Sequence, residues 1–182
     1  DVRLVGSEMC IRDSSDAAID GLEQSGIRAV FLHGTPKPDP TPGQPHFSEV
    51  PMPVNEVARL RNGRMSGSDK KVTMGLAILG PQMAVNDVCF QDFKLAKDMD
   101  LVTSMHHSGL QMAGEQAYDM ASKAGLLGEH INIVHGNELL DKDLDILIND
   151  GATFTITAEV EMQMSYGNPL SARLLEKNHS FS

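Results

Sequence analysis

Two apolar segments constrain the fold of this chain more than any other feature. Residues 101–109 (LVTSMHHSG) and 131–137 (INIVHGN) start thirty residues apart, and each passes from a short apolar run to a histidine followed by a small residue. This pattern is typical of a buried parallel strand that carries an imidazole to its carboxyl end. A helix-sized stretch separates the two segments. The pair therefore predicts two successive parallel strands that end at His106 and His135.

The repeated strand-end histidine favours a metal or acid–base site. A single histidine beside an apolar run is more often a core or loop residue, but two in succession indicate chemistry. His33 ends a third apolar run, 27–34, and is a candidate substrate-binding residue, with a hydrogen bond inside a loop as the alternative. His107 fits a ligand less well than His106, because adjacent strand residues point to opposite faces. It would replace His106 if the register were shifted by one residue.

The rest of the chain alternates between strand and helix patterns. Further strands are expected at 27–33, 72–79 and 153–158, and helices at 15–25, 54–64, 87–99, 110–124, 137–150 and from about 170. Such alternation predicts an α/β fold with about five parallel strands and right-handed crossovers. A doubly wound open sheet and a section of a β/α barrel both satisfy it. No glycine-rich nucleotide-binding motif follows any strand, and polar residues at three strand ends favour the barrel.

Two stretches lie outside this alternation. Residues 1–14 show no clean period and resemble translated sequencing-adapter DNA, with an irregular N-terminal arm as the alternative. Residues 35–53 hold seven of the nine prolines, which predicts a long irregular loop. A loop of this length is either a lid or binding segment or an ordinary surface excursion.

Composition limits the kind of partner and the extent of the fold. The chain has 182 residues, whereas a complete β/α barrel has about 250, so it is expected to be part of something larger. A formal net charge of -10 argues against nucleic acid and anionic membranes as partners. No run of 18 apolar residues and no secretory signal are found, and the two cysteines are far apart. A cytoplasmic location is the expectation.

Several motifs resemble the amidohydrolase superfamily, in the branch of cytosine deaminase, adenosylhomocysteine deaminase-like enzymes and triazine chlorohydrolases. They are SGIRAV at 25–30, SMH at 104–106, VHGN at 134–137, AEVEMQM from 158 running on to Gly167, and RLL at 173–175. The resemblance implies that residues 15–182 form an incomplete TIM-type (β/α)8 barrel domain. The strands would be the third to seventh of that barrel.

The resemblance also implies roles for individual residues. His106 would be a metal ligand on the fifth barrel strand, and His135, on the sixth, would bind metal or steer the attacking water. Glu161 lies where relatives have a substrate-binding residue, although an ion-paired or exposed glutamate is the other interpretation. One divalent ion, Zn or Fe, is expected, because imidazole suits both metals. The implied reaction is hydrolysis of a non-peptide carbon–nitrogen or related bond in a small cyclic substrate.

Departures from the family pattern limit this prediction. The first-strand His-x-His and the eighth-strand aspartate are absent, and Gly109 stands where many deaminases have a glutamate. Deamination is therefore in doubt, and the base-deaminase signature H-x-E with P-C-x-x-C is also missing. The chain alone is expected to be inactive. The alternatives are a barrel relative that has lost its metal and an open-sheet protein that binds a small ligand. The sequence predicts no oligomeric state.

Overall fold

Five short parallel strands form the centre of the fold. The computed structural model describes residues 8–35, 37, 39–109 and 112–182. The strands are β1 (Ala29–Gly34), β2 (Val72–Ala77), β3 (Val102–His107), β4 (Ile131–His135) and β5 (Thr153–Thr155). They pair in the order β1-β2-β3-β4-β5, and every pair is parallel.

This strand order decides between the two architectures that the sequence left open. A doubly wound sheet reverses its strand order at a switch point, whereas a β/α barrel adds each new strand beside the previous one. The order here is strictly sequential across all five strands. The prediction of an α/β fold with about five parallel strands from a TIM-type barrel is confirmed.

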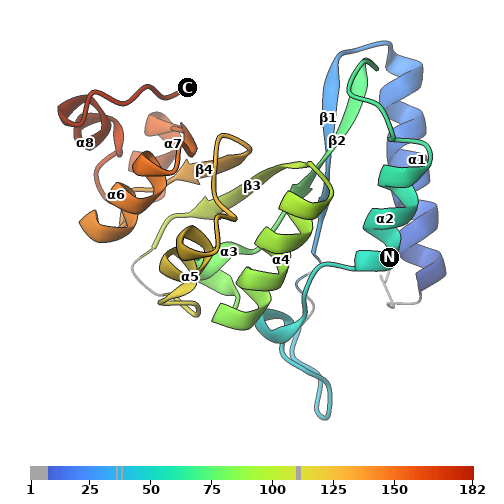
Figure 1. The fold of residues 1–182 in the computed structure, drawn as a ribbon, viewed down its shortest axis with the longest axis horizontal. Helices are drawn as coiled ribbons and strands as arrows, with labels where there is room; N and C mark the ends of the chain where they lie inside the picture. Colours follow the sequence, from blue (N-terminus) through green and yellow to red (C-terminus); the bar gives the residue numbers. More distant parts are fainter. Residues whose placement is uncertain (1–7, 36, 38, 110–111) are drawn as a thin grey trace.

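Helices connect the strands and cover one face of the sheet, as right-handed crossovers require. They are α1 (Glu8–Ser25), α2 (Val54–Asn62), α3 (Gly80–Met83), α4 (Asn86–Asp98), α5 (Ala117–Lys123), α6 (Asp141–Asn149), α7 (Ala158–Gln163) and α8 (Ser171–Glu176). Figure 1 shows α1 and α2 beside β1 and β2 at one end of the molecule, and α6, α7 and α8 at the other. Across the described ranges, the structure contains no helix with the length and apolar character to cross a membrane.

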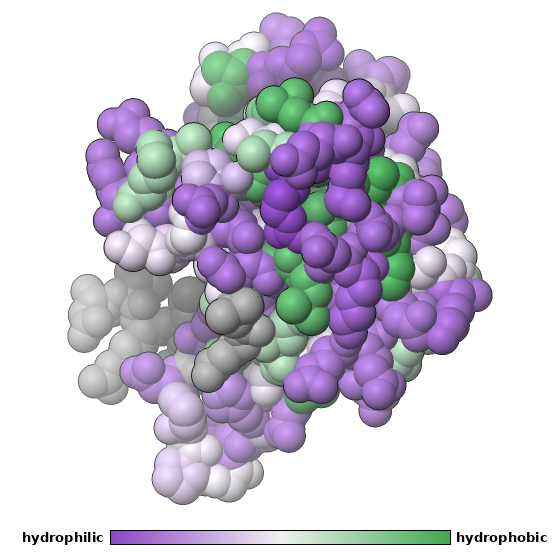
Figure 2. Space-filling view, turned by 90° about the vertical axis from the view of Figure 1, so that its left-hand side faces the viewer, coloured by the Kyte–Doolittle hydropathy of each residue, from purple (hydrophilic) through white to green (hydrophobic). Residues whose placement is uncertain are grey.

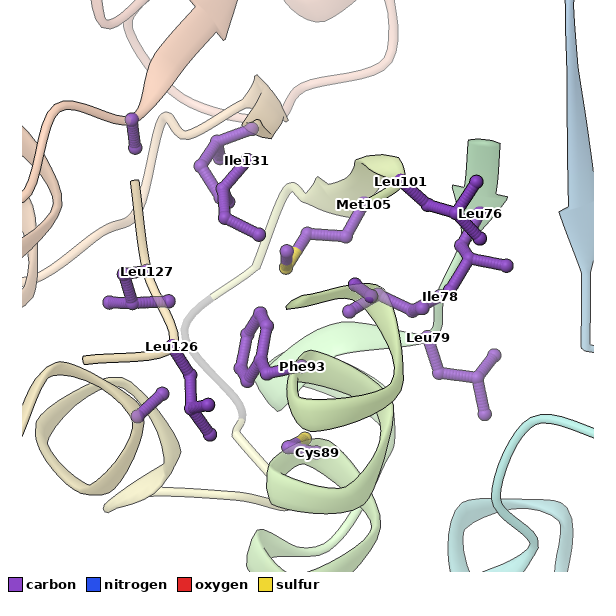
Figure 3. Packing of buried hydrophobic residues seen from close by; sticks show 14 of the residues in the cluster. Leu76, Ile78, Leu79, Cys89, Phe93, Leu101, Met105, Leu126, Leu127 and Ile131 are labelled. Carbon is purple, nitrogen blue, oxygen red and sulfur yellow. The ribbon is translucent and has the colours of Figure 1, made fainter. Parts of the chain in front are cut away.

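The core lies between the sheet and these helices. Phe93 of α4 packs among strand residues that include Leu76, Met105 and Ile131, and each of these side chains is at most 1% exposed (Figure 3). Complete burial of one such side chain stabilises the fold by about 1.5–3 kcal/mol. This packing fixes the strands relative to one another, and with them the residues at their carboxyl ends.

The opposite face of the sheet is open in the described part of the chain. Val30, Leu32 and Val102 point to that side and are 38–49% exposed. We call this side of the sheet, opposite the helices, the open face. Side chains alternate along β3, so that His106 is exposed on the open face while His107 is buried on the helix side. The expectation that His106 and His107 point in opposite directions is confirmed.

His107 is a core residue in this arrangement. Its Nδ1 lies 3.3 Å from the Tyr118 hydroxyl, and burial lowers the pKa of His107 to about 4. The imidazole is therefore neutral at physiological pH and helps to pack α5 against β3.

Where the Pro-rich segment is described, at 35, 37 and 39–53, it is irregular apart from one 3-10 turn, η1 (Phe47–Glu49). Two hydrogen bonds attach the end of this segment to the helix layer, and in each the donor is a backbone N–H. The Met52 N–H donates to Asp92 Oδ1 at 2.8 Å, and the Val85 N–H donates to the Ser48 carbonyl at 3.1 Å. The segment is therefore attached to α4 before α2 begins.

The structure differs from the predicted elements in some of their bounds, and it adds the short helix α3. Helix α1 begins at Glu8 instead of residue 15, so it starts inside the stretch expected to be irregular. Residues 1–7 lie outside the described residues. Helix α5 begins at Ala117 instead of about residue 110, because a turn closed by the Ala117 N–H and the Gly114 carbonyl precedes it; residues 110 and 111 are not described. Helix α7 was not predicted.

The face formed by the C-terminal helices is mostly hydrophilic, with scattered apolar side chains (Figure 2). Exposed apolar residues of this part of the chain include Val160, Met162, Met164 and Leu175. Single exposed apolar side chains are normal on the surfaces of folded domains.

Candidate functional site

The two predicted histidines lie together at the carboxyl ends of β3 and β4. The register pairs His106 with Val134 and His107 with His135. The ring centres of His106 and His135 are 5.0 Å apart, with an interplanar angle of 69°. The strands are adjacent, and the two imidazoles face each other at the edge where barrel enzymes carry their active sites.

The orientation of His135 depends on a change of backbone conformation. By strand alternation, His135 would continue the row of Ile131 and Ile133 on the helix side. Instead, His135 has a φ of 75° and Gly136 a φ of 74°, so the strand ends in two left-handed residues. The Gly136 N–H donates to the His107 carbonyl at 2.8 Å and holds this turn against β3. A left-handed residue other than glycine costs about 1–2 kcal/mol.

The Nδ1 atom of His135 is engaged by the protein. It lies 3.1 Å from Glu161 Oε1 and 3.1 Å from Thr157 Oγ1. His135 is only 7% exposed, so these contacts lie in a largely desolvated setting. Because Nδ1 is occupied, Nε2 is the nitrogen that this imidazole can offer to a metal or a water.

Glu161 is the buried carboxylate of the site. It lies in the first turn of α7 and is 0% exposed. Its Oε1 accepts the Thr157 N–H at 2.7 Å and its Oε2 accepts Asn137 Nδ2 at 3.0 Å. Burial alone would raise the pKa of Glu161, but the donors from Thr157, Asn137 and His135 together hold that pKa below its ordinary value. Glu161 is therefore ionised at neutral pH.

The aromatic ring of Tyr166 also lies close to the His135 ring. The two ring centres are 5.4 Å apart at an interplanar angle of 68°. Ser165 and Gly167 on either side of it both have positive φ values, 59° and 91°. This sharp turn after α7 places the phenol beside the imidazole.

Sequence reasoning missed Thr157, Asn137 and Tyr166 as members of the site. Asn137 was in the VHGN motif, and its position two residues after His135 was a usable signal. Thr157 immediately precedes α7 and Tyr166 lies in the turn that follows it, and no hydrophobic period in the sequence indicated this helix. Their role depends on tertiary contacts.

His33 lies elsewhere in the sheet. It ends β1, which is separated from β3 by β2. Its side chain is 4% exposed on the helix side, where burial lowers the pKa of the imidazole and the nearby Glu56 opposes that effect. No described contact joins His33 to His106 or His135, and its predicted contact with substrate stays a prediction. Of the two interpretations of Glu161, the contacts favour the ion-paired one.

The two imidazoles are residues that could supply two ligands to a metal ion. Two imidazoles that bind the same tetrahedral ion through nitrogens at about 2.0–2.1 Å have ring centres about 5 Å apart. The observed 5.0 Å matches this separation. Burial, His135 and Lys37 all lower the pKa of His106, which favours the neutral imidazole that metals bind. Within the described ranges, no three His, Cys, Asp or Glu side chains form a group that could hold an ion.

Comparisons with known proteins give structural relatives only. No protein-family model matches the sequence, and neither does any curated protein. An adenosine deaminase from Xanthomonas campestris with bound zinc matches with a TM-score of 0.67 and 14% identity, over 92% of this chain and 39% of that chain. Atrazine chlorohydrolase TrzN from Arthrobacter aurescens TC1, complexed with zinc, gives 0.67 and 15%, over 92% and 40%. Helicobacter pylori aminofutalosine deaminase, in complex with methylthio-coformycin, gives 0.64 and 16%, over 90% and 45%.

These matches establish the fold. The chain covers between 39% and 45% of the length of these structures, which are two deaminases and a chlorohydrolase. Its five strands and their helices share the fold of one section of those chains. The resemblance seen in the sequence motifs is thereby confirmed at the level of fold.

Proposed function

We propose that this chain is a section of a metal-dependent hydrolase that acts on a carbon–nitrogen or related bond of a small molecule. The observation that carries the proposal is the pair of imidazoles, 5.0 Å apart, at the carboxyl ends of adjacent strands. The fold shared with deaminases and a chlorohydrolase supports it. The remaining ligands would come from other strands of a complete barrel.

In this proposal His106 is a metal ligand, and His135 is a ligand or the group that holds the attacking water. When bound, a divalent ion supplies hydroxide from water at neutral pH. The Nδ1 atom of His135 is hydrogen-bonded to Glu161 and Thr157, which leaves Nε2 as the ring nitrogen available to an ion or a water. Nε2 is therefore able to bind an ion or to accept a proton from water.

We propose zinc as the metal and a nitrogen-containing ring as the substrate. Two of the related structures contain zinc. Their names describe an adenosine deaminase and an atrazine chlorohydrolase, which act where a ring carbon carries an amine or a halide. Attack of water at such a carbon forms a carbon–oxygen bond and releases the amine or halide. We propose a cytoplasmic location for this enzyme.

A barrel relative without metal is the second candidate. It is favoured by the absence, within the described residues, of a third ligand near His106 and His135. Gly109 also replaces the glutamate expected of a deaminase three residues after His106.

Zinc binding by the chain itself separates these candidates. Isothermal titration with Zn²⁺ should show one site, and His106→Ala or His135→Ala should each weaken binding at least tenfold, which is about 1.4 kcal/mol. His46→Ala is the control, because this exposed histidine lies in the Pro-rich segment and contacts Ser48. Absence of zinc binding, or equal loss with His46→Ala, would contradict the proposed metal site.

A further inference from the structure

We infer that Glu161, together with Thr157 and Asn137, positions His135 by fixing which of its ring nitrogens carries the proton. In this assignment Glu161 is a positioning residue that acts through the imidazole. The part of the inference that concerns metal rests on the proposed function. The part that concerns the proton on His135 does not.

The hydrogen-bond chemistry determines the proton position. Both oxygens of Glu161 accept N–H donors, Oε1 from Thr157 and Oε2 from Asn137, and a carboxylate that accepts at both oxygens has no hydrogen to donate. His135 Nδ1 lies 3.1 Å from Glu161 Oε1, so Nδ1 must carry the hydrogen of this pair. The neutral imidazole then has its lone pair on Nε2, which is the form that binds a metal ion or accepts a proton.

The surrounding donors are consistent with this assignment. Thr157 donates to Glu161 Oε1 through its N–H at 2.7 Å and through its hydroxyl at 3.2 Å. Because that hydroxyl has a single hydrogen, its oxygen is an acceptor toward His135 Nδ1 at 3.1 Å. Asn137 Nδ2 donates to Glu161 Oε2 and to the Asn168 carbonyl, both at 3.0 Å.

The position of Glu161 argues for this role over direct contact with a substrate. The residue is fully buried and both carboxylate oxygens are engaged by protein donors. A buried carboxylate is tolerated only when it is paired and hydrogen-bonded, and here every partner belongs to the strand ends or to the start of α7. The network thus links β4, the β5–α7 connection and the turn after α7.

The unusual backbone conformation of His135 requires contacts that hold its side chain in place. With a φ of 75°, this residue is in a strained conformation that the local sequence does not favour. The Gly136 N–H fixes the main chain, whereas Glu161 and Thr157 fix the side chain. Together they hold the imidazole facing His106.

The test is ¹⁵N NMR of the histidine rings in the metal-free chain, with Glu161→Gln as the variant. At a pH where the ring is neutral, the His135 signals of the wild-type chain should be those of the tautomer with its proton on Nδ1. The glutamine side chain removes the charge that favours a proton on Nδ1. With its amide group in place of Oε1, it would donate a hydrogen bond to Nδ1 instead of accepting one. The His135 signals should therefore move toward the tautomer protonated on Nε2, and zinc affinity should fall about 10–100-fold.

Two further variants separate positioning from folding. Glu159→Gln, on the same helix, changes an exposed carboxylate that contacts only Gln163 in the described structure and should leave the His135 signals unchanged. Thr157→Val removes one of the two Nδ1 partners and should shift the signals in the same direction as Glu161→Gln, by a smaller amount. Circular dichroism confirms that each variant is folded.

The outcomes of the two measurements are distinct. Unchanged His135 signals in folded Glu161→Gln would overturn the inference, and so would a wild-type ring protonated on Nε2. If the wild-type chain binds no zinc but its His135 signals respond to Glu161→Gln, the proposed metal site fails and the positioning role stands.

Discussion

Replacing Gly136 with alanine should destabilise the folded chain by about 2–5 kcal/mol and displace the His135 imidazole. Gly136 has a φ of 74°, which costs an alanine about 1–2 kcal/mol. An alanine Cβ at this position would lie 2.6 Å from Leu170 Cδ2 and 3.2 Å from Leu139 Cδ1. Both leucines are buried, so the overpacking adds about 1–3 kcal/mol. Urea denaturation followed by circular dichroism measures the change.

A second glycine with a similar φ separates the backbone strain of Gly136→Ala from its steric clash with the leucines. Gly26 has a φ of 70°, and a Cβ added there would meet no atom within 4 Å, so Gly26→Ala should cost only the backbone strain. The difference between the two variants reports the clash at Gly136. In a Leu170→Ala background, Gly136→Ala should be less destabilising than in the wild-type background. Equal losses for Gly26→Ala and Gly136→Ala would show that Leu170 does not constrain the turn.

The sheet and the directions of the side chains along β3 could be predicted from the sequence, because both depend on local patterns. Apolar runs of strand length alternating with helical periods produced the five-strand parallel sheet that the structure contains. The two-residue period along β3 also separated His106 from His107 correctly, since that strand is regular up to its last residue.

The environment of His135 could not be predicted in the same way. Strand periodicity places its side chain on the helix side, and only the positive φ brings it toward His106. Its partners Glu161 and Thr157 are more than twenty residues further along the chain and are set by α7, a helix with no detectable apolar period. The sequence identified the chemical groups, whereas the network that orients them follows from tertiary packing.

The contribution of Asp92 to the unfolding free energy should fall as the pH rises from about 4 to about 7. This carboxyl group is 2% exposed on α4, and burial raises its pKa to about 7, although the Met52 N–H hydrogen bond opposes the effect. In the unfolded chain the pKa is the ordinary 3.8. Between these values the Asp92 carboxyl group binds more protons in the folded state than in the unfolded state, so its contribution to stability decreases with increasing pH.

Asp92→Asn should remove this dependence and make the chain more stable than the wild type at pH 9 by about 4 kcal/mol, since one pKa unit corresponds to about 1.36 kcal/mol. The asparagine keeps an oxygen for the Met52 N–H and carries no charge. Asp98→Asn is the control, because this exposed residue of α4 pairs only with Lys94 and such pairs contribute little. Urea denaturation at pH 5, 7 and 9 compares the three proteins. Asp92 also anchors the Pro-rich segment through the Met52 N–H. If the unfolding free energy of Asp92→Asn changed with pH as steeply as that of the wild type, Asp92 would not be the buried acid with a raised pKa.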